Sequence, residues 1–176
     1  MLAYRAVREP SRHRVGIWRR LKDAGALYLQ DAVAALPSSA AHRRLLTALA
    51  VECREHGGDA VVLTAAGLGT GDQVELVARF NAERDREYAE ITAQCRALLG
   101  DVERETAHRE FVYAALEDTE SNLTRLRGWA DKVRARDFLD APGGQQARTM
   151  LEECEEAVES FAAAVHDHHD TRRDQS

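Results

Sequence analysis

The sequence predicts an α+β protein, in which a small antiparallel sheet with two helices precedes a bundle or hairpin of about three long helices. Three observations support this prediction. Short apolar segments alternate with helical segments before residue 66, and apolar residues recur at helical spacing over long stretches after residue 72. A glycine-rich segment, 67–71, separates the two regions. At 176 residues, 44% of them hydrophobic, the chain can bury one large core or two modest cores.

The first strand is expected at residues 2–7, where the segment contains tyrosine and valine and stops before a proline. A helix follows it, and Ser11 is a residue of the type that caps helix N-termini. In this helix Val15, Trp18 and Leu21 recur every three residues. We therefore expect these three side chains to pack against the sheet, with Trp18 mostly buried.

Two strands at 26–30 and 33–36, a second helix and a strand at 60–64 complete the N-terminal region. The second helix is indicated by apolar residues at helical spacing, namely Leu45, Leu46, Leu49, Ala50 and Cys53. The resulting order, β-α-β-β-α-β, is that of the ferredoxin-like unit. Residues 1–66 are thus predicted to form a basic ferredoxin-like domain, with helices on one face only of a four-stranded antiparallel sheet.

Residues 72–166 are predicted to form an acidic α-helical domain. Three stretches keep helical spacing, and breaks between them are expected at 100–101 and at 140–144. The segment 167–176 is predicted to be a flexible tail, because it has no apolar face. Each predicted long element of the chain carries at most one cysteine, on its apolar side, and we expect these thiols to be buried and reduced: Cys53, Cys95 and Cys154.

Membrane insertion is not expected, because no apolar run approaches the roughly 18 residues that cross a bilayer. An odd number of well-separated cysteines is typical of a reducing compartment. We therefore predict a cytoplasmic protein.

The net charge of −6 is distributed unevenly along the chain. Residues 1–58 contain ten Lys or Arg and five Asp or Glu, so the rest of the chain carries −11. Such a basic end attracts anions, and we predict nucleic-acid or anion binding there; an ordinary solvated helix face is the alternative. The candidate binding residues are the cations of the first 22 positions: Arg5, Arg8, Arg12, Arg14, Arg19, Arg20 and Lys22.

The sequence does not favour an enzyme, and no catalytic residue, cofactor or metal site is predicted. A carboxylate-bridged metal pair in a bundle requires two Glu-x-x-His motifs, and only Glu105 with His108 has this spacing. The segment 67–71 lacks the lysine of a phosphate-binding loop. His166, His168 and His169 could bind a transition metal loosely, but a solvated tail is the simpler interpretation.

Two stretches carry a resemblance to a known family. YRAVREPSRHRVGIWRRLKDAGALYLQDAVAALP (4–37) resembles the N-terminal domain of ChrB-type chromate-resistance regulators, and FNAERDREYAEI (80–91) is similar to the helix that follows in that family. More distantly, the first 66 residues are similar to the middle domain of PaaX-type transcriptional repressors. The resemblance implies a regulatory role in chromate or stress response, with DNA binding proposed for the longer members of the family. The chain departs from the family in having Asp31-Ala32, where Asp-Gly is usual, and in lacking the C-terminal domain of full ChrB proteins, which leaves chromate sensing open.

Two functions are therefore expected as alternatives. The first is a transcriptional regulator whose partners are DNA and chromate or another oxyanion, with the helices forming a homodimer or coupling to a sensor. The second is a non-enzymatic protein-interaction module that binds its partner through the acidic helices. Neither involves a membrane.

Overall fold

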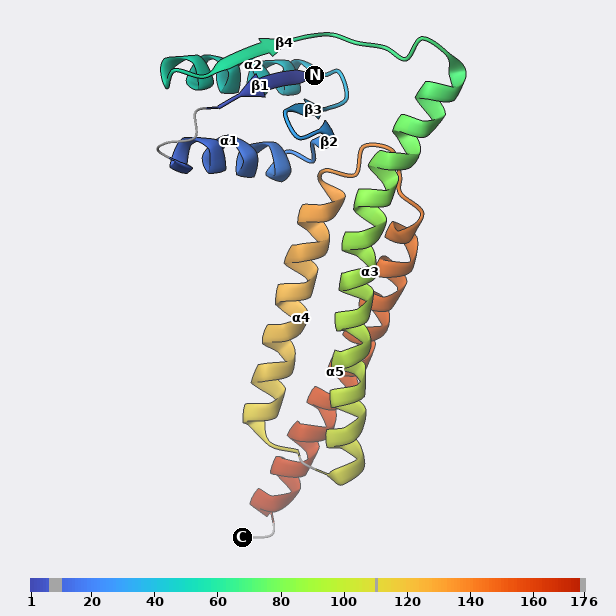
Figure 1. The fold of residues 1–176 in the computed structure, drawn as a ribbon. Coiled ribbons are helices and arrows are strands. Elements are labelled where there is room, and N and C mark those ends of the chain that lie inside the picture. The colour runs from blue at the N-terminus through green and yellow to red at the C-terminus, as the bar shows by residue number, and fades with distance from the viewer. Residues whose placement is uncertain (7–10, 110, 175–176) are drawn as a thin grey trace. The chain divides into compact units, whose positions relative to one another are not determined.

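The computed structural model describes residues 1–6, 11–109 and 111–174. Its elements in chain order are β1 (Leu2–Arg5), α1 (Ser11–Asp23), β2 (Leu27–Gln30), β3 (Val33–Ala35), α2 (Ala40–Glu55), β4 (Asp59–Val62), α3 (Thr70–His108), α4 (Tyr113–Arg134) and α5 (Gly143–Asp174) (Figure 1). The predicted combination of a small sheet and several long helices is confirmed.

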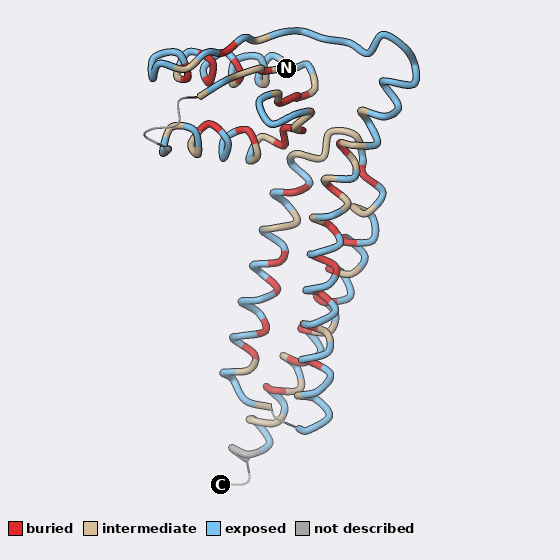
Figure 2. Tube along the Cα trace, viewed as in Figure 1, coloured by how far each residue is buried: buried red, intermediate tan, exposed pale blue. Residues whose placement is uncertain are grey.

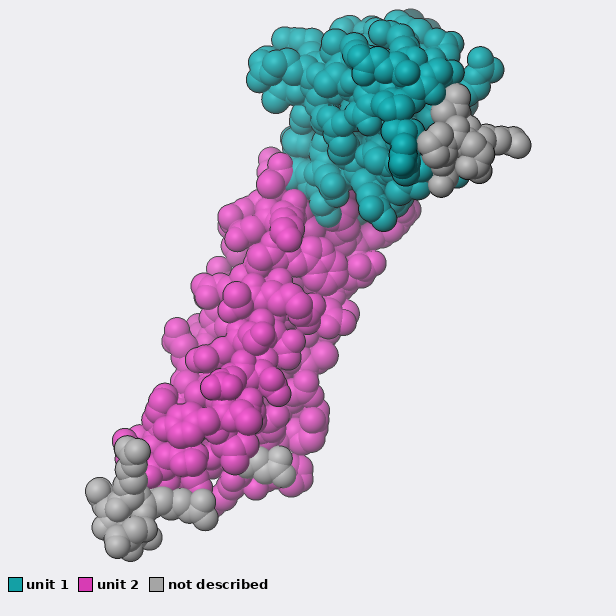
Figure 3. Space-filling model, turned by 90° about the vertical axis from the view of Figure 1, so that its left-hand side faces the viewer, with its two compact units in different colours: residues 1–83, 136–139 teal, residues 84–135, 140–176 magenta. Residues whose placement is uncertain are grey.

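The chain divides into two compact units. Unit 1 comprises Met1–Glu83 and Arg136–Leu139, and unit 2 comprises Arg84–Ala135 and Asp140–Ser176 (Figure 3). The division falls inside α3 and not at the glycine-rich segment, so the first turns of this helix belong with the sheet. Unit 1 holds 12 Lys or Arg and 10 Asp or Glu, whereas unit 2 holds 12 and 20.

The four strands form one antiparallel sheet in the order β2-β3-β1-β4. Leu2 in β1 lies opposite Ala34 on one side and Val62 on the other. The predicted four-stranded antiparallel sheet is therefore confirmed.

One face of the sheet is covered by α1 and α2. Because side chains alternate along a strand, Leu2, Ala34 and Ala60 point to the same face. They form a core with apolar side chains of the two helices, among them Ile17, Leu21, Leu46, Leu49 and Cys53. Each helix has a clear end: a glycine with positive φ follows it, Gly25 (78°) after α1 and Gly57 (79°) after α2.

The prediction that helices lie on only one face of the sheet is wrong, because the start of α3 packs on the other face. Leu27 and Ala35 point to this face and form a small core with Phe80 of α3. Leu76, also in α3, and Leu139, in the segment that returns between α4 and α5, pack against the same core. Apolar side chains point to both faces of the sheet, so both faces must be shielded from water. The exposed connection after β4 allows α3 to pack on the second face.

Unit 2 consists of the remainder of α3 with α4 and α5. Figure 2 shows buried positions recurring along the three long helices, and they belong to one core that includes Ile91, Cys95, Leu126, Val133, Cys154 and Phe161. The break expected at 100–101 is wrong, because α3 continues through Gly100 to His108. Glycine inside a helix costs about 1 kcal/mol, which the burial of Leu98 and Val102 on either side offsets.

The two observed breaks have non-glycine residues in the left-handed region. The chain leaves α3 at Arg109 (φ 56°), and Asp140 (φ 52°) lies in the connection between α4 and α5, where a break was predicted. The segment predicted as a flexible tail begins inside α5, which continues to Asp174. There His169 Nε2 donates a hydrogen bond to the Phe111 carbonyl at 3.1 Å, and its ring stacks on Tyr113 at 4.5 Å.

All three cysteines are free and buried, as predicted. Cys154 Sγ donates to the carbonyl of Cys95 at 3.5 Å, which places these two residues together in the core of unit 2. Burial raises the pKa of each thiol, and raises the pKa of Cys154, which also lies beside Cys95, to about 12. Thiols of this kind are poor nucleophiles at neutral pH.

Candidate nucleic-acid interface

Helix α1 carries five of the seven predicted binding cations. Arg12, Arg14, Arg19 and Arg20 are exposed and Lys22 is half-buried. No acidic residue lies in the first turn of the helix. The helix lies on the sheet through Ile17 and Leu21, which are 1% and 0% exposed, so its cations are displayed around the remainder of its circumference.

Trp18 does not pack against the sheet, and its predicted burial is wrong. Its side chain is 47% exposed, and the neighbouring Ile17 occupies the buried position. One residue turns a helix by about 100°, so the helix is rotated from the orientation that Val15, Trp18 and Leu21 suggested. Ile17 and Leu21, four residues apart, form an equally good apolar row, and they bury two aliphatic chains without enclosing an indole N–H.

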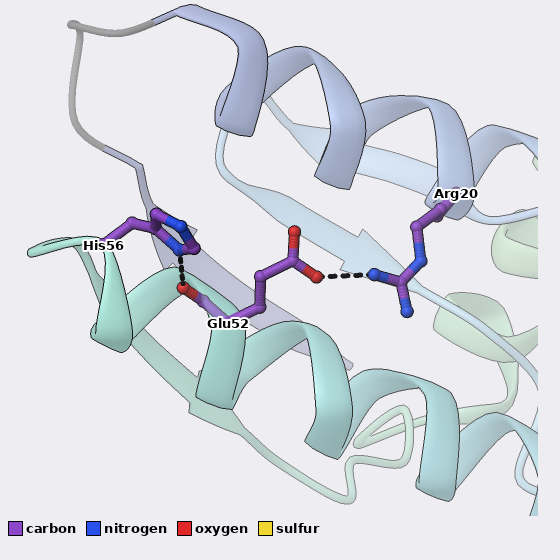
Figure 4. A network of polar contacts seen from close by, with 3 residues as sticks. All are labelled: Arg20, Glu52 and His56. Atoms are coloured by element: carbon purple, nitrogen blue, oxygen red, sulfur yellow. Dashed lines mark hydrogen bonds and ion pairs between the residues drawn. The ribbon is translucent and has the colours of Figure 1, made fainter.

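The side of α1 that faces α2 is occupied by contacts within the protein. Arg20 reaches across to α2, where its Nη1 lies 2.5 Å from Oε2 of Glu52 (Figure 4). Next to this pair, the rings of His13 and His56 lie with their centroids 3.6 Å apart. His56 Nδ1 donates to the Glu52 carbonyl at 2.8 Å, which orients its ring. Arg20 therefore has a structural partner.

The surroundings of His13 favour its neutral form. Partial burial lowers the pKa of His13, and the nearby His56 and Arg12 lower it further, against a smaller opposite effect of Glu52. Arg12 Nε also donates to His13 Nε2 at 3.3 Å, a contact that requires this nitrogen to be unprotonated. The contacts at this end of α1 thus favour the neutral imidazole.

Lys22, at the other end of α1, is also engaged within unit 1. Its Nζ lies 3.6 Å from Oε2 of Glu83 and 5.9 Å from the centroid of the Tyr28 ring. Tyr28 in turn shares a hydrogen bond of 2.9 Å with the hydroxyl of Tyr4. Lys22 is therefore a weaker candidate for binding a ligand than its position in the sequence suggested.

Of the two cations that precede α1, Arg5 does not join its surface. Arg5 follows Tyr4, which packs with the core under α1 and α2, so alternation directs Arg5 to the opposite face of the sheet. It lies in register with Asp59 of β4, an opposite charge on the neighbouring strand. Arg8 lies outside the described residues.

Three arginines remain as the exposed, unneutralised part of the predicted site. Within the described part of the chain, no ion pair with a carboxylate is found for Arg12, Arg14 or Arg19. Arg12 and Arg19 are seven residues apart, two helical turns on one side, while Arg14 lies one turn from Trp18. We call Arg12, Arg14 and Arg19 the α1 arginine cluster. Arg14, two residues from Arg12, lies about 200° around the helix from it, so only Arg12 and Arg19 share a side. Each guanidinium group by itself matches the geometry of phosphate oxygens.

Sequence reasoning missed two features of this surface. Trp18 was assigned to the core, although exposed tryptophan between cationic residues is a frequent feature of interfaces. Arg43 and Arg44 at the start of α2 are also exposed, and they were not considered because they lie outside the first 22 residues. The sequence signal for Arg43 and Arg44 was the absence of acidic residues in the first turn of α2.

The described residues contain neither a cluster of metal ligands nor a helix suited to crossing a membrane. Among residues 1–6, 11–109 and 111–174, no group of three or more His, Cys, Asp and Glu is arranged to hold a metal ion. None of the helices described is long and apolar enough to cross a membrane.

The fold and the surface define an α+β protein with a basic helix on its sheet in one unit and acidic helices in the other. Over residues 14–172 the chain matches the model of the family described as "Protein ChrB, N-terminal", and it therefore belongs to the ChrB N-terminal family. This membership supports an association with chromate resistance. Neither a search of curated proteins nor a search of solved structures finds a significant match.

Proposed function

We propose that this protein is a transcriptional regulator of the ChrB type that binds DNA and is not an enzyme. The observation that carries the proposal is the α1 arginine cluster: three exposed guanidinium groups on one helix, without a carboxylate partner in the described structure. The other cations of α1 are held by Glu52 and Glu83. The cluster is therefore the part of the basic region that is available to a phosphate backbone.

The contacts proposed are to phosphates and not to base edges. Phosphate contacts fix a protein on DNA without reading its sequence, and their strength falls steeply with salt. Unit 1, which carries the cluster, has a small positive balance, whereas unit 2 has eight more acids than cations. A DNA surface would therefore be attracted to unit 1 and repelled by unit 2.

Two further assignments belong to this proposal. We assign unit 1 to the ferredoxin-like class; its support is the element order β1-α1-β2-β3-α2-β4 and the sheet order β2-β3-β1-β4. We also propose a cytoplasmic location, where buried, free thiols remain reduced.

The test is DNA binding by the whole protein as a function of salt. A labelled duplex from upstream of its own gene and a duplex of shuffled sequence are titrated at about 50 to 200 mM salt. The expected result is salt-dependent binding, with a slope that falls by about three units in the triple variant Arg12→Gln/Arg14→Gln/Arg19→Gln. Because the cluster is proposed to contact phosphates only, the triple variant should lose affinity for both duplexes to a similar extent.

A charge-matched variant serves as control. Arg96→Gln/Arg125→Gln/Arg148→Gln removes three exposed arginines from unit 2 and should leave the slope unchanged. Loss of binding to the same extent in both variants would mean that only net charge matters. Absence of binding to either duplex would overturn the proposal and favour a protein-interaction module that uses the acidic helices.

A further inference from the structure

Unit 1 contains a cavity of about 850 Å³ that is separate from the α1 arginine cluster. Its walls come from the connection between β3 and α2, the first turns of α2, the segment after β4 and the first turns of α3. Cavities of this size commonly hold small organic molecules in proteins. Every residue that lines it belongs to unit 1, so the cavity depends on this unit alone.

The interior of the cavity is apolar. Its walls include Leu36, Leu46, Val62, Leu76, Phe80 and Leu139. At its margin, Leu63 and Val77 are 49% and 42% exposed, so apolar surface is left in contact with water. Covering this surface with the apolar part of a ligand is favourable by the hydrophobic effect.

One end of the cavity is polar and basic. Arg43 and Ser38 lie there, with Arg43 Nη1 donating to Ser38 Oγ at 3.3 Å. Among the described residues no carboxylate pairs with Arg43, and most of its guanidinium donors are therefore open to a ligand. The acidic lining residue, Asp72, lies on α3 and accepts a hydrogen bond from the Gly69 amide at 3.1 Å.

The position of Arg43 at the start of α2 adds to its preference for an anion. The first turn of α2 contains no acidic residue, and Ser39 caps it by accepting a hydrogen bond from the His42 amide at 3.0 Å. The positive end of the helix dipole thus lies beside the guanidinium group. His42 closes this wall, since its Nδ1 donates to the Pro37 carbonyl at 2.8 Å and its ring meets Phe138 edge-on at 4.9 Å.

We propose that this cavity binds a small amphipathic carboxylate, with its carboxylate on Arg43 and its apolar body between Leu46 and Phe80. The ligand would act as an effector in a regulator, but the site does not depend on DNA binding. An apolar body alone would leave Arg43 unused, and a cation would meet it with like charge. The apolar lining together with the Arg43 guanidinium group therefore favours an organic anion with one apolar end.

The proposal is tested by calorimetric titration of the whole protein with three probes. Decanoate, below its micelle-forming concentration, should bind, whereas acetate, which has the head group alone, should not. Decyltrimethylammonium, which has the same chain and the opposite charge, should bind at least tenfold more weakly than decanoate. Equal binding of the two long-chain probes, or no binding of decanoate, would overturn the proposal.

Two pairs of variants locate the site. Arg43→Ala should weaken decanoate binding about tenfold, because a charge-assisted hydrogen bond is lost. Arg44→Ala, at the next position and not among the residues lining the cavity, should leave binding unchanged. Val77→Trp should narrow the cavity at its margin and weaken decanoate binding, while Val51→Trp, at a similarly exposed position of α2 that does not line the cavity, should not. Equal effects within either pair would contradict the assignment.

Discussion

Basic side chains lie both on the α2-facing side of α1 and elsewhere on the helix, but only some of them have a carboxylate partner within the described structure. On the side facing α2, Arg20 is held by Glu52, and the ring of His13 lies against the ring of His56. Elsewhere on the helix, Arg12 and Arg19 are exposed and have no ion pair in the described structure. The number of cations in a segment therefore does not define a binding site. What defines it is which of those cations the tertiary structure leaves without a carboxylate.

The largest expected effect concerns the buried side of the helix. Ile17→Ala should lower the free energy of unfolding by about 2 to 5 kcal/mol, because Ile17 is 1% exposed in the core under the sheet. Trp18→Ala should cost no more than about 1 kcal/mol, because Trp18 is 47% exposed. Urea unfolding of both variants measures the difference. If Trp18→Ala proved the more destabilising, the orientation of α1 would be wrong.

The ion pair between α1 and α2 should contribute much less. A double-mutant cycle with Arg20→Ala and Glu52→Ala is expected to give a coupling of about 0 to 1 kcal/mol, since both side chains are partly in water, with exposed fractions of 47% and 30%. The matched cycle with Arg19→Ala and Glu52→Ala should give none. A coupling for Arg19 as large as that for Arg20 would remove the distinction between the two sides.

The histidine pair should make the stability depend on pH in one direction. Because the pKa of His13 is lowered in the folded state, the unfolded chain binds more protons as the pH falls below about 6.5. The contribution of neutral His13 to the stability of the folded state is therefore complete above this pH and is lost on acidification. Comparing unfolding of the wild type and His13→Asn between pH 7.5 and 5 should show a smaller pH dependence in the variant. A stability that increases on acidification in a His13-dependent way would contradict the sign.

The long helices and the small antiparallel sheet could be predicted, because both depend on local periodicity. In α3 the apolar spacing from Tyr88 to Leu98 is unambiguous, and burial follows it. In α1, a helix of 13 residues, two apolar rows compete, and only packing decides between Ile17 and Trp18. Short helices give the periodicity too few turns to determine an orientation.

The candidate site could be predicted only in part. Arg12, Arg14 and Arg19 stand out by charge, but the partner of Arg20 lies 32 residues further along the chain, and no local pattern reveals it. The position of Arg5 could have been found, because alternation with Leu2 and Tyr4 places it on the other face of the sheet. The cavity could not, since its walls come from segments as far apart as Leu36 and Leu139.

The measurement that tests the central claim most directly compares two neighbouring arginines in DNA binding. The salt dependence of duplex binding is recorded for the whole protein, for Arg19→Gln, and for Arg20→Gln/Glu52→Gln, which removes the ion pair without changing the net charge. Arg19→Gln should lower the slope of log K against log salt by about one unit, as expected for the loss of one phosphate contact. The double variant should leave the slope unchanged. A slope that is unaffected by Arg19→Gln, or reduced equally by both, would contradict the assignment of the exposed side of α1 as the DNA-binding surface.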